Sequence, residues 1–111
     1  MFRDDRQKCA VIRVLLRHVG QAELWSETGP TADAIELLAA RGGPLSHGQA
    51  VMLRVAFDIW GGDGHIELNE IMSTLDPDGL LLVGTLLTAV AHEASGVSVS
   101  VDAWLSPRQR A

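Results

Sequence analysis

The sequence predicts an all-α protein: a small bundle of four main helices and one short helix, followed by an extended C-terminal segment. Apolar residues recur at the three- and four-residue spacing of helices over most of the chain. Glycine and proline clusters interrupt this spacing, and helices are expected to end and begin there. A chain of 111 residues holds one domain. We place that domain at residues 1–105 and a flexible basic tail at residues 106–111.

The first predicted helix, from about Asp4 to Val19, has two different sides. Its apolar side carries Cys9, Ile12, Leu15, Leu16 and Val19. Arg6, Arg13 and Arg17 line up on the other side at helical spacing. Three stacked arginines can hold a phosphate or an acidic partner. They can equally form a solvated face with some ion pairing, and both interpretations stay open.

A pair of helices joined by a short turn comes next. The first begins at Gly29-Pro30-Thr31, because proline fits the first turn of a helix, where its missing N–H costs nothing. It ends at Gly42-Gly43-Pro44. The second, at about residues 46–60, begins with Ser46 and Gln49 in the spacing of a capping box. Apolar residues cover most of its circumference, so we expect it at the centre of the bundle.

Two more helices follow a glycine-rich stretch. A short helix is predicted near Leu68 to Thr74. Asp76 and Pro77 then fit the N-cap and first position of a helix that runs to about Ala94. This last helix, like the central one, is apolar nearly all round. A bundle of this size has too few other residues to bury both helices completely. The apolar surface that remains exposed predicts a homodimer. The alternative is that the other helices cover them.

Beyond Gly96 the spacing of apolar residues changes to that of a strand. Val97, Val99 and Val101 alternate with polar residues. With no second convincing strand in the sequence, residues 97–101 are expected to run extended across the helices or to pair with their copy in another subunit. Trp104 is expected to anchor the end of this segment.

The stretch between Trp60 and Ile71 is rich in glycine and carboxylates. It resembles the second half of an EF-hand calcium loop over about twelve residues, with matches at Asp63, Gly64, Ile66 and Glu70. The resemblance implies a loop whose oxygens ligate a calcium ion.

The same loop departs from the EF-hand pattern in its first half. The family's first and third ligand positions fall on Ile59 and Gly61, which have no side-chain oxygen, and Asp58 lies one residue too early. A calcium ion takes about six to eight oxygen ligands, more than this loop offers. The alternative is a glycine turn that delivers Ile66 to the core and caps the short helix.

The acidic loop also contains residue types that ligate transition metals. Histidine and carboxylate suit zinc or manganese, and the candidate metal ligands are Asp63, His65, Glu67 and Glu70. His65 and Glu67 are two residues apart, so they point to the same side only if the backbone there is extended.

Charge is unevenly distributed along the chain, whose formal net charge is −5. The first twenty residues are basic, whereas residues 55–105 contain carboxylates and no lysine or arginine. Three arginines on an acidic protein are too few for a nucleic-acid footprint, so no nucleic-acid partner is predicted. An unknown protein partner is compatible with the pattern, and the predicted partner surface consists of Arg6, Arg13, Arg17, Trp60 and Trp104.

The sequence indicates a soluble cytoplasmic protein. Its start has no apolar stretch typical of a secretory signal. The longest apolar run, residues 80–91, is shorter than the roughly 20 residues of a membrane span, so no membrane partner is predicted. The single cysteine, Cys9, cannot form an internal disulfide, which fits a reducing compartment.

No set of residues in the sequence indicates catalysis. The glycine-rich loop lacks the Lys-Ser/Thr ending of a phosphate-binding loop, and Cys9 lies on an apolar helix face. We therefore expect no cofactor and favour a small non-enzymatic interaction or regulatory protein, acting through a helical homodimer or a helix-lined apolar surface. The alternative is a ligand- or metal-binding protein, or a minor enzyme, that uses the glycine-rich loop at residues 61–70.

Overall fold

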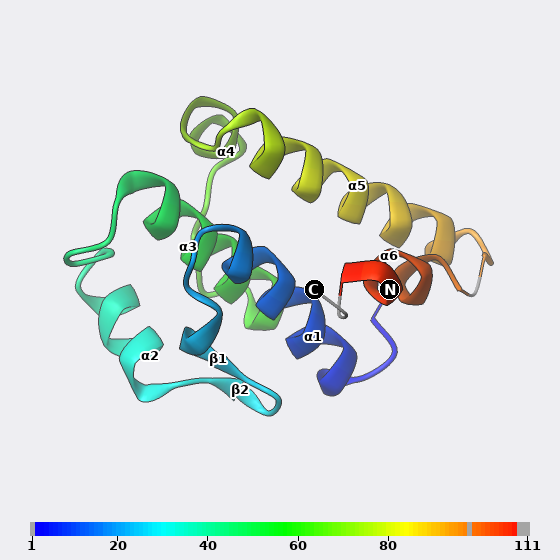
Figure 1. The fold of residues 1–111 in the computed structure, drawn as a ribbon, viewed down its shortest axis with the longest axis horizontal. Coiled ribbons are helices and arrows are strands. Elements are labelled where there is room, and N and C mark those ends of the chain that lie inside the picture. Colours follow the sequence, from blue (N-terminus) through cyan, green and yellow to red (C-terminus); the bar gives the residue numbers. More distant parts are fainter. Residues whose placement is uncertain (1, 98, 109–111) are drawn as a thin grey trace.

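Helix α3 lies near the middle of the molecule, with α1 packed against it (Figure 1). The computed structural model describes residues 2–97 and 99–108. In chain order the elements are α1 (Asp5–His18), the 3-10 turn η1 (Ala22–Leu24), β1 (Trp25–Ser26), β2 (Gly29–Pro30), α2 (Ala32–Ala39), α3 (His47–Gly61), α4 (Leu68–Thr74), α5 (Pro77–Ala94) and α6 (Ser100–Arg108). The predicted all-α class is confirmed, with one short hairpin added.

The core is built mainly by α1 and α3. Helix α1 contacts α3 and also α5 and α6, so it connects α3 to the last two helices of the chain. Fully buried apolar side chains come from both helices, among them Ile12, Leu15 and Leu16 of α1 and Met52 and Leu53 of α3. The sequence placed the centre at α3 alone, whereas the structure shows that α1 shares it.

Local capping groups set the bounds of α3 and α5. Ser46 and Gln49 form the predicted capping box at the start of α3. Gly62 ends α3 in the left-handed conformation, with a φ of 82°. Asp76 accepts the N–H of Gly79 at 2.7 Å at the start of α5. Because these caps are local, the predicted bounds of α3, α4 and α5 agree closely with the observed ones.

The start of α2 differs from the prediction. Pro30 is not in the first helical turn, because it pairs with Trp25 in the β1–β2 hairpin. Thr31 is the N-cap instead and accepts the N–H of Ala34 at 3.2 Å. The hairpin places Trp25 in the core, where its ring meets Phe57 edge-on with centroids 5.0 Å apart. The β1–β2 hairpin therefore ends before α2 begins.

The predicted extended C-terminal segment is wrong, because residues 100–108 form α6. Val101, Trp104 and Leu105 are buried, and their spacing of three and four residues lies on one side of a helix. Val97 and Val99, which suggested a strand, are exposed. Residues 100–108 are therefore helical because a helix buries these three side chains against α5. The short alternation of valines, which is typical of a strand, does not determine the conformation.

Helix α6 also alters the predicted tail at residues 106–111. The helix continues through Arg108, whose guanidinium lies 4.7 Å from the centroid of the Trp104 ring. Residues 106–108 therefore belong to the helix, and residues 109–111 lie outside the described residues.

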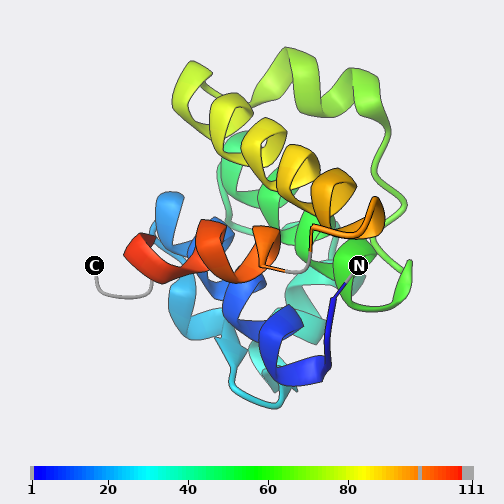
Figure 2. The same ribbon diagram turned by 90° about the vertical axis from the view of Figure 1, so that its right-hand side faces the viewer.

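Helices α4 and α5 form one long edge of the molecule, and α6 lies beneath α5 (Figure 2). Within residues 2–97 and 99–108, no helix combines the length and the apolar character that crossing a membrane requires.

One partly buried hydrogen bond links α6 to α5 and can be tested directly. The indole N–H of Trp104 donates to Thr85 Oγ1 at 3.1 Å. Replacement of Thr85 by valine leaves that N–H without its partner, so we expect Thr85→Val to lower the free energy of unfolding by about 1–2 kcal/mol. Urea denaturation followed by tryptophan fluorescence measures the change.

The matched control is Thr88→Val on the same helix, because the Thr88 hydroxyl bonds only to the carbonyl of Gly84 in its own helix. We expect a change below about 0.5 kcal/mol for this control. Equal losses in the two variants would contradict the role of the Trp104–Thr85 hydrogen bond.

Candidate functional site

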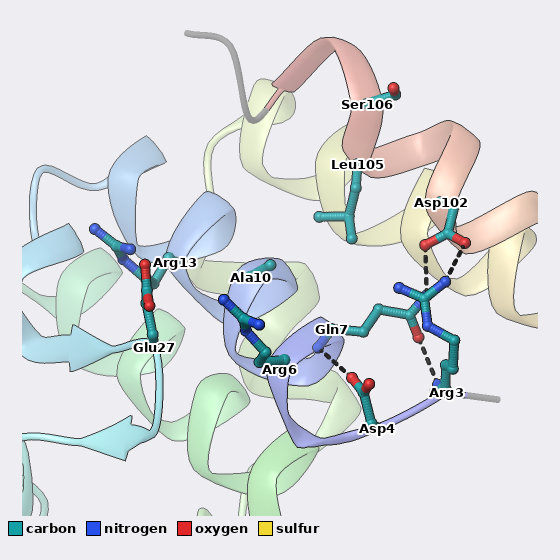
Figure 3. A pocket seen from close by; sticks show the side chains of 10 residues that line it. All are labelled: Arg3, Asp4, Arg6, Gln7, Ala10, Arg13, Glu27, Asp102, Leu105 and Ser106. Carbon is teal, nitrogen blue, oxygen red and sulfur yellow. Dashed lines mark hydrogen bonds and ion pairs between the residues drawn. The ribbon is translucent and has the colours of Figure 1, made fainter.

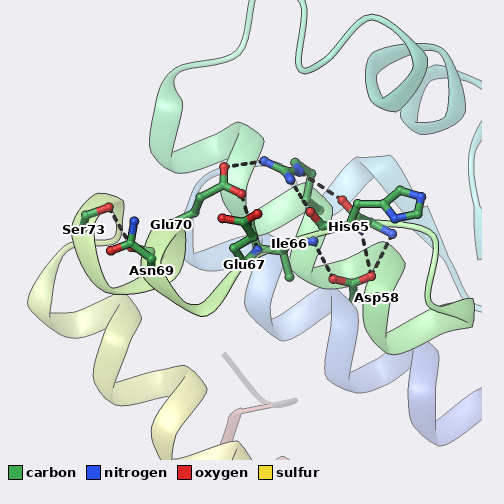
Figure 4. A network of polar contacts seen from close by, with 9 residues as sticks. Asp58, His65, Ile66, Glu67, Asn69, Glu70 and Ser73 are labelled. Carbon is green, nitrogen blue, oxygen red and sulfur yellow. Dashed lines mark hydrogen bonds and ion pairs between the residues drawn. The ribbon is translucent and has the colours of Figure 1, made fainter.

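The glycine-rich loop between α3 and α4 is fixed to α3 by Asp58, in its last turn. The Asp58 carboxylate accepts three backbone N–H groups: those of Gly64 at 2.9 Å, His65 at 3.0 Å and Ile66 at 2.9 Å (Figure 4). One side chain thereby satisfies three consecutive donors of the loop. The loop is held against α3 by these bonds.

Arg54, one helical turn earlier on α3, holds the same loop through its carbonyl groups. Its Nε donates to the carbonyl of Gly64 at 3.0 Å, and a terminal nitrogen donates to the carbonyl of His65. The other terminal nitrogen pairs with the Glu70 carboxylate of α4 at 2.6 Å. We call Arg54, Asp58, Glu70 and the loop backbone that they bind the α3 clasp.

The α3 clasp gives the EF-hand resemblance a physical explanation. Glu70, which the resemblance implied as a calcium ligand, pairs with a guanidinium, and the same guanidinium binds two loop carbonyls. An internal cation therefore uses oxygens that a metal ion would use. In the described part of the chain, no three His, Cys, Asp or Glu side chains gather as a metal-binding set. The predicted ligands Asp63, His65, Glu67 and Glu70 are not brought together in that way.

Gly64 is required in the clasp by close packing rather than by its backbone angles. A Cβ atom at this position would lie 1.9 Å from the carbonyl oxygen of Arg54 and 2.8 Å from its carbonyl carbon. Both atoms belong to the backbone of α3, so the loop would have to move away from the helix.

A pocket of about 740 Å³ lies between the α2–α3 turn and the clasp. We call it the α3 pocket, and its lining includes Leu38, Arg41, His47, Ala50, Val51, Arg54, Asp63, His65, Glu70 and Thr74. Three of the four predicted metal ligands thus border the same pocket, together with a histidine and an arginine from the α2–α3 region. Its volume falls within the range of small-molecule sites.

Two lining residues of the α3 pocket have unusual backbone conformations. Arg41 has a φ of 56° and His65 a φ of 52°, and they are the non-glycine residues with positive φ in the described part of the chain. Such conformations are strained for residues with a Cβ atom and tend to occur at functional sites.

The predicted partner surface does not form one surface. Arg6 and Arg13 line a second pocket, of about 520 Å³, between α1 and α6 (Figure 3), and Arg17 donates to the carbonyl of Arg108 at 3.3 Å. Trp60, however, is partly buried against Trp25.

Trp104 is 6% exposed and belongs to the core. Aromatic residues are few in this chain, and packing of the core uses both of these tryptophans. The assignment of Trp104 to the partner surface is therefore wrong, because its side chain is buried, whereas Trp60 is only partly buried and its place on a partner surface stays a prediction.

The largest exposed apolar side chains on neighbouring elements lie on α4 and α5. Leu68 and Met72 of α4 are 67% and 59% exposed, and Leu81 and Leu87 of α5 are 67% and 61% exposed. Gly84, between the two leucines of α5, has no atom within 4 Å of where a Cβ would stand. We call these five residues the α4–α5 apolar face. The sequence indicated a surplus on α5 but missed the contribution of α4.

Among the described residues, three titratable groups have pKa values displaced by their surroundings. The hydrogen bond from Arg54 lowers the pKa of the Glu70 carboxyl, and the hydrogen bond from His18 lowers that of Asp76. Burial raises the pKa of the Cys9 thiol, which disfavours the thiolate that a nucleophile requires.

Comparisons with protein-family models, with curated proteins and with solved structures found no match to this chain. The geometry of the clasp, the pocket and the apolar face therefore carries the functional argument.

Gly64→Ala tests the close packing of the clasp. Because the added Cβ meets the backbone of Arg54, we expect this variant to lose about 3 kcal/mol of stability or more. Gly48→Ala is the control, since a Cβ there meets no atom within 4 Å, and it should change stability by less than about 1 kcal/mol. Chemical denaturation of both variants gives the comparison. A Gly64→Ala protein as stable as the wild type would contradict the packing argument.

Glu70→Gln tests the ion pair of the clasp through its pH dependence. A carboxyl whose pKa is lowered on folding stabilises the fold above its unfolded pKa, and this contribution is lost as the pH falls through the folded pKa. We expect the wild type to be more stable than Glu70→Gln at neutral pH, with a difference that shrinks once the pH falls below about 4.3. Thermal unfolding over a pH series measures it. A difference that stays constant down to about pH 3 would contradict the ion pair.

Proposed function

We propose that this protein is a non-enzymatic interaction protein that associates with a second copy of itself through the α4–α5 apolar face. The observation that carries the proposal is the exposure of Leu81 and Leu87 on α5, at 67% and 61%. Exposed large apolar side chains that gather on one surface of a small protein often mark an interaction surface.

The side of α5 that faces outward has no charge along most of its length. Between Asp78 and His92 the helix contains no ionisable side chain. A partner with a charged complementary surface would therefore find no countercharge here. The same uncharged stripe on a second copy would match it, because a two-fold axis pairs each patch with itself.

Gly84 supports close contact between two such helices. It lies between Leu81 and Leu87, and the space beside it is open. In an antiparallel pair with its two-fold axis near Gly84, Leu81 of each copy would lie near Leu87 of the other, and the glycines would allow the helix axes to approach. The outward side of α5 in one copy can thus match the same side in a second copy in shape as well as in charge.

A dimer interface of ordinary size would cover a modest part of this chain's surface. A typical specific interface buries about 800 Å² per partner, which is roughly one eighth of the 6333 Å² surface of this chain. Helix α5, with 18 residues, is about 27 Å long. Leu68 and Met72 add exposed apolar side chains on α4, the helix that precedes α5.

Several cations are already used within the fold, which supports a protein partner rather than a nucleic acid. Arg3 pairs with Asp102 at 2.8 Å and Arg54 pairs with Glu70 at 2.6 Å. A phosphate backbone requires several free cations on one face. The lone Cys9, which is buried and free, supports a cytoplasmic location.

The proposal is tested with the double variant Leu81→Glu/Leu87→Glu. Sedimentation velocity over a concentration series measures the dimer dissociation constant. Burial of each leucine contributes about 1.5–3 kcal/mol, so the two substitutions should raise the dissociation constant by about a hundredfold or more.

Ile35→Glu on α2 is the matched control, because Ile35 is 54% exposed and lies on a different element. It should leave the dissociation constant unchanged. A wild-type protein that is monomeric at all concentrations, or a dimer that survives the double substitution, would rule out the α4–α5 apolar face as the dimer interface.

A further inference from the structure

We propose that the α3 pocket binds a small organic acid with one anionic end, an apolar middle and a hydrogen-bond donor at the other end. This ligand site is separate from the α4–α5 apolar face. The anionic group, a carboxylate or a phosphate, lies beside Arg41 and His47, and the donor lies beside Asp63 and His65. The apolar middle lies over Ala50.

The shape of the pocket follows from one face of α3. His47, Ala50, Val51 and Arg54 all line it, and their spacing of three, four and seven residues places them on a single side of the helix. From His47 to Arg54 the helix rises about 10 Å. An elongated small molecule that lies along the helix therefore fits the pocket, with its ends at two chemically different regions.

The end near the start of α3 is electropositive. The guanidinium of Arg41 makes no ion pair with any residue in the ranges 2–97 and 99–108, whereas Arg54 uses all three of its nitrogens within the clasp. His47 is the first residue of α3, and the positive end of the helix dipole adds to the charge there. An anionic group is therefore favoured at this end.

The middle and far end select the rest of the ligand. Leu38, Ala50 and Val51 provide apolar contact. Asp63 at the far end is a carboxylate with no ion-pair partner among the described residues. It repels a second anionic group and accepts hydrogen bonds, so the ligand carries a hydroxyl or amino group there rather than a second acid.

Backbone strain falls on the two residues that would contact the ends of the ligand. Arg41 and His65 both have left-handed backbones, a conformation that glycine adopts without strain. The chain uses glycine for two further left-handed positions of the same turn, Gly42 and Gly43. It keeps a long cationic side chain at position 41, where the side chain borders the pocket.

Both rims of the pocket are held in place without a ligand. The α3 clasp fixes the loop that carries Asp63 and His65. On the other rim, a Cβ on Gly42 would lie 2.7 Å from the Cβ of Ala50, so the α2–α3 turn packs tightly on α3. A site that is already formed loses little entropy when it binds a small molecule.

The test is a titration of the isotope-labelled protein, monitored by two-dimensional amide NMR. The probes are p-hydroxyphenylacetate, its neutral amide p-hydroxyphenylacetamide, and p-hydroxyphenyl phosphate. We expect saturable shifts at the amides of His47, Gly48, Gly64 and His65 with the anionic probes and none with the neutral amide. Tighter binding of p-hydroxyphenyl phosphate would identify a phosphate ligand, and tighter binding of p-hydroxyphenylacetate would identify a carboxylate; either result supports the proposal.

Variants separate the proposed site from nonspecific anion binding. Arg41→Gln should weaken binding of the anionic probes by about tenfold, and His65→Asn, which tolerates a left-handed backbone, should weaken it less. Arg6→Gln, on α1 outside the pocket, is the control and should bind as the wild type does.

Three results would overturn the proposal: no saturable shifts at millimolar probe, equal shifts with the neutral amide, or wild-type affinity in Arg41→Gln. The titration is repeated with Leu81→Glu/Leu87→Glu. Binding by this variant would show that the pocket functions whether or not the protein self-associates, so failure of one proposal is distinguishable from failure of the other.

Discussion

Two charged side chains on an otherwise apolar helix, Arg54 and Asp58, hold the structure between α3 and α4 together. The loop that they bind contains Gly61, Gly62 and Gly64, and ordering such a loop has a large entropic cost. Asp58 offsets it by accepting three consecutive N–H groups, and Arg54 by donating to carbonyls of the same residues. Here the cation that binds these oxygens is the guanidinium of Arg54, which belongs to the helix and is always charged.

The position of the second half of the chain depends on this loop. Glu70 links α4 to Arg54, and α5 begins three residues after α4 ends. A second tie acts at the start of α5, where His18 of α1 lies 3.0 Å from Asp76. Helix α6 then packs between α5 and α1, and its Asp102 accepts hydrogen bonds from both Arg3 and Gln7 near the N-terminus. These contacts turn one side of α5 toward the core and leave its other side in solvent, where Leu81 and Leu87 are found.

Sequence patterns predicted the elements whose signals are local. The capping box at Ser46 and the Asp76-Pro77 start fix helix bounds within a few residues, because each is a contact between near neighbours. The conformation of residues 100–108 was missed because it depends on burial of Trp104 against α5, a distant contact. The clasp was missed for the same reason. Two isolated charges four residues apart on an apolar helix beside a glycine-rich loop were a usable signal, since buried charges require partners.

Helix α4 connects the two proposed sites physically. Glu70 and Thr74 line the α3 pocket, whereas Leu68 and Met72 are exposed. Glu70 and Thr74 are four residues apart, as are Leu68 and Met72. The second pair is shifted by two residues from the first, which places the two pairs on opposite sides of the helix. A helix of seven residues is too short to be stable alone. Its orientation therefore depends on contacts with the rest of the fold, among them the ion pair between Glu70 and Arg54 and the packing of Ile71 against the core.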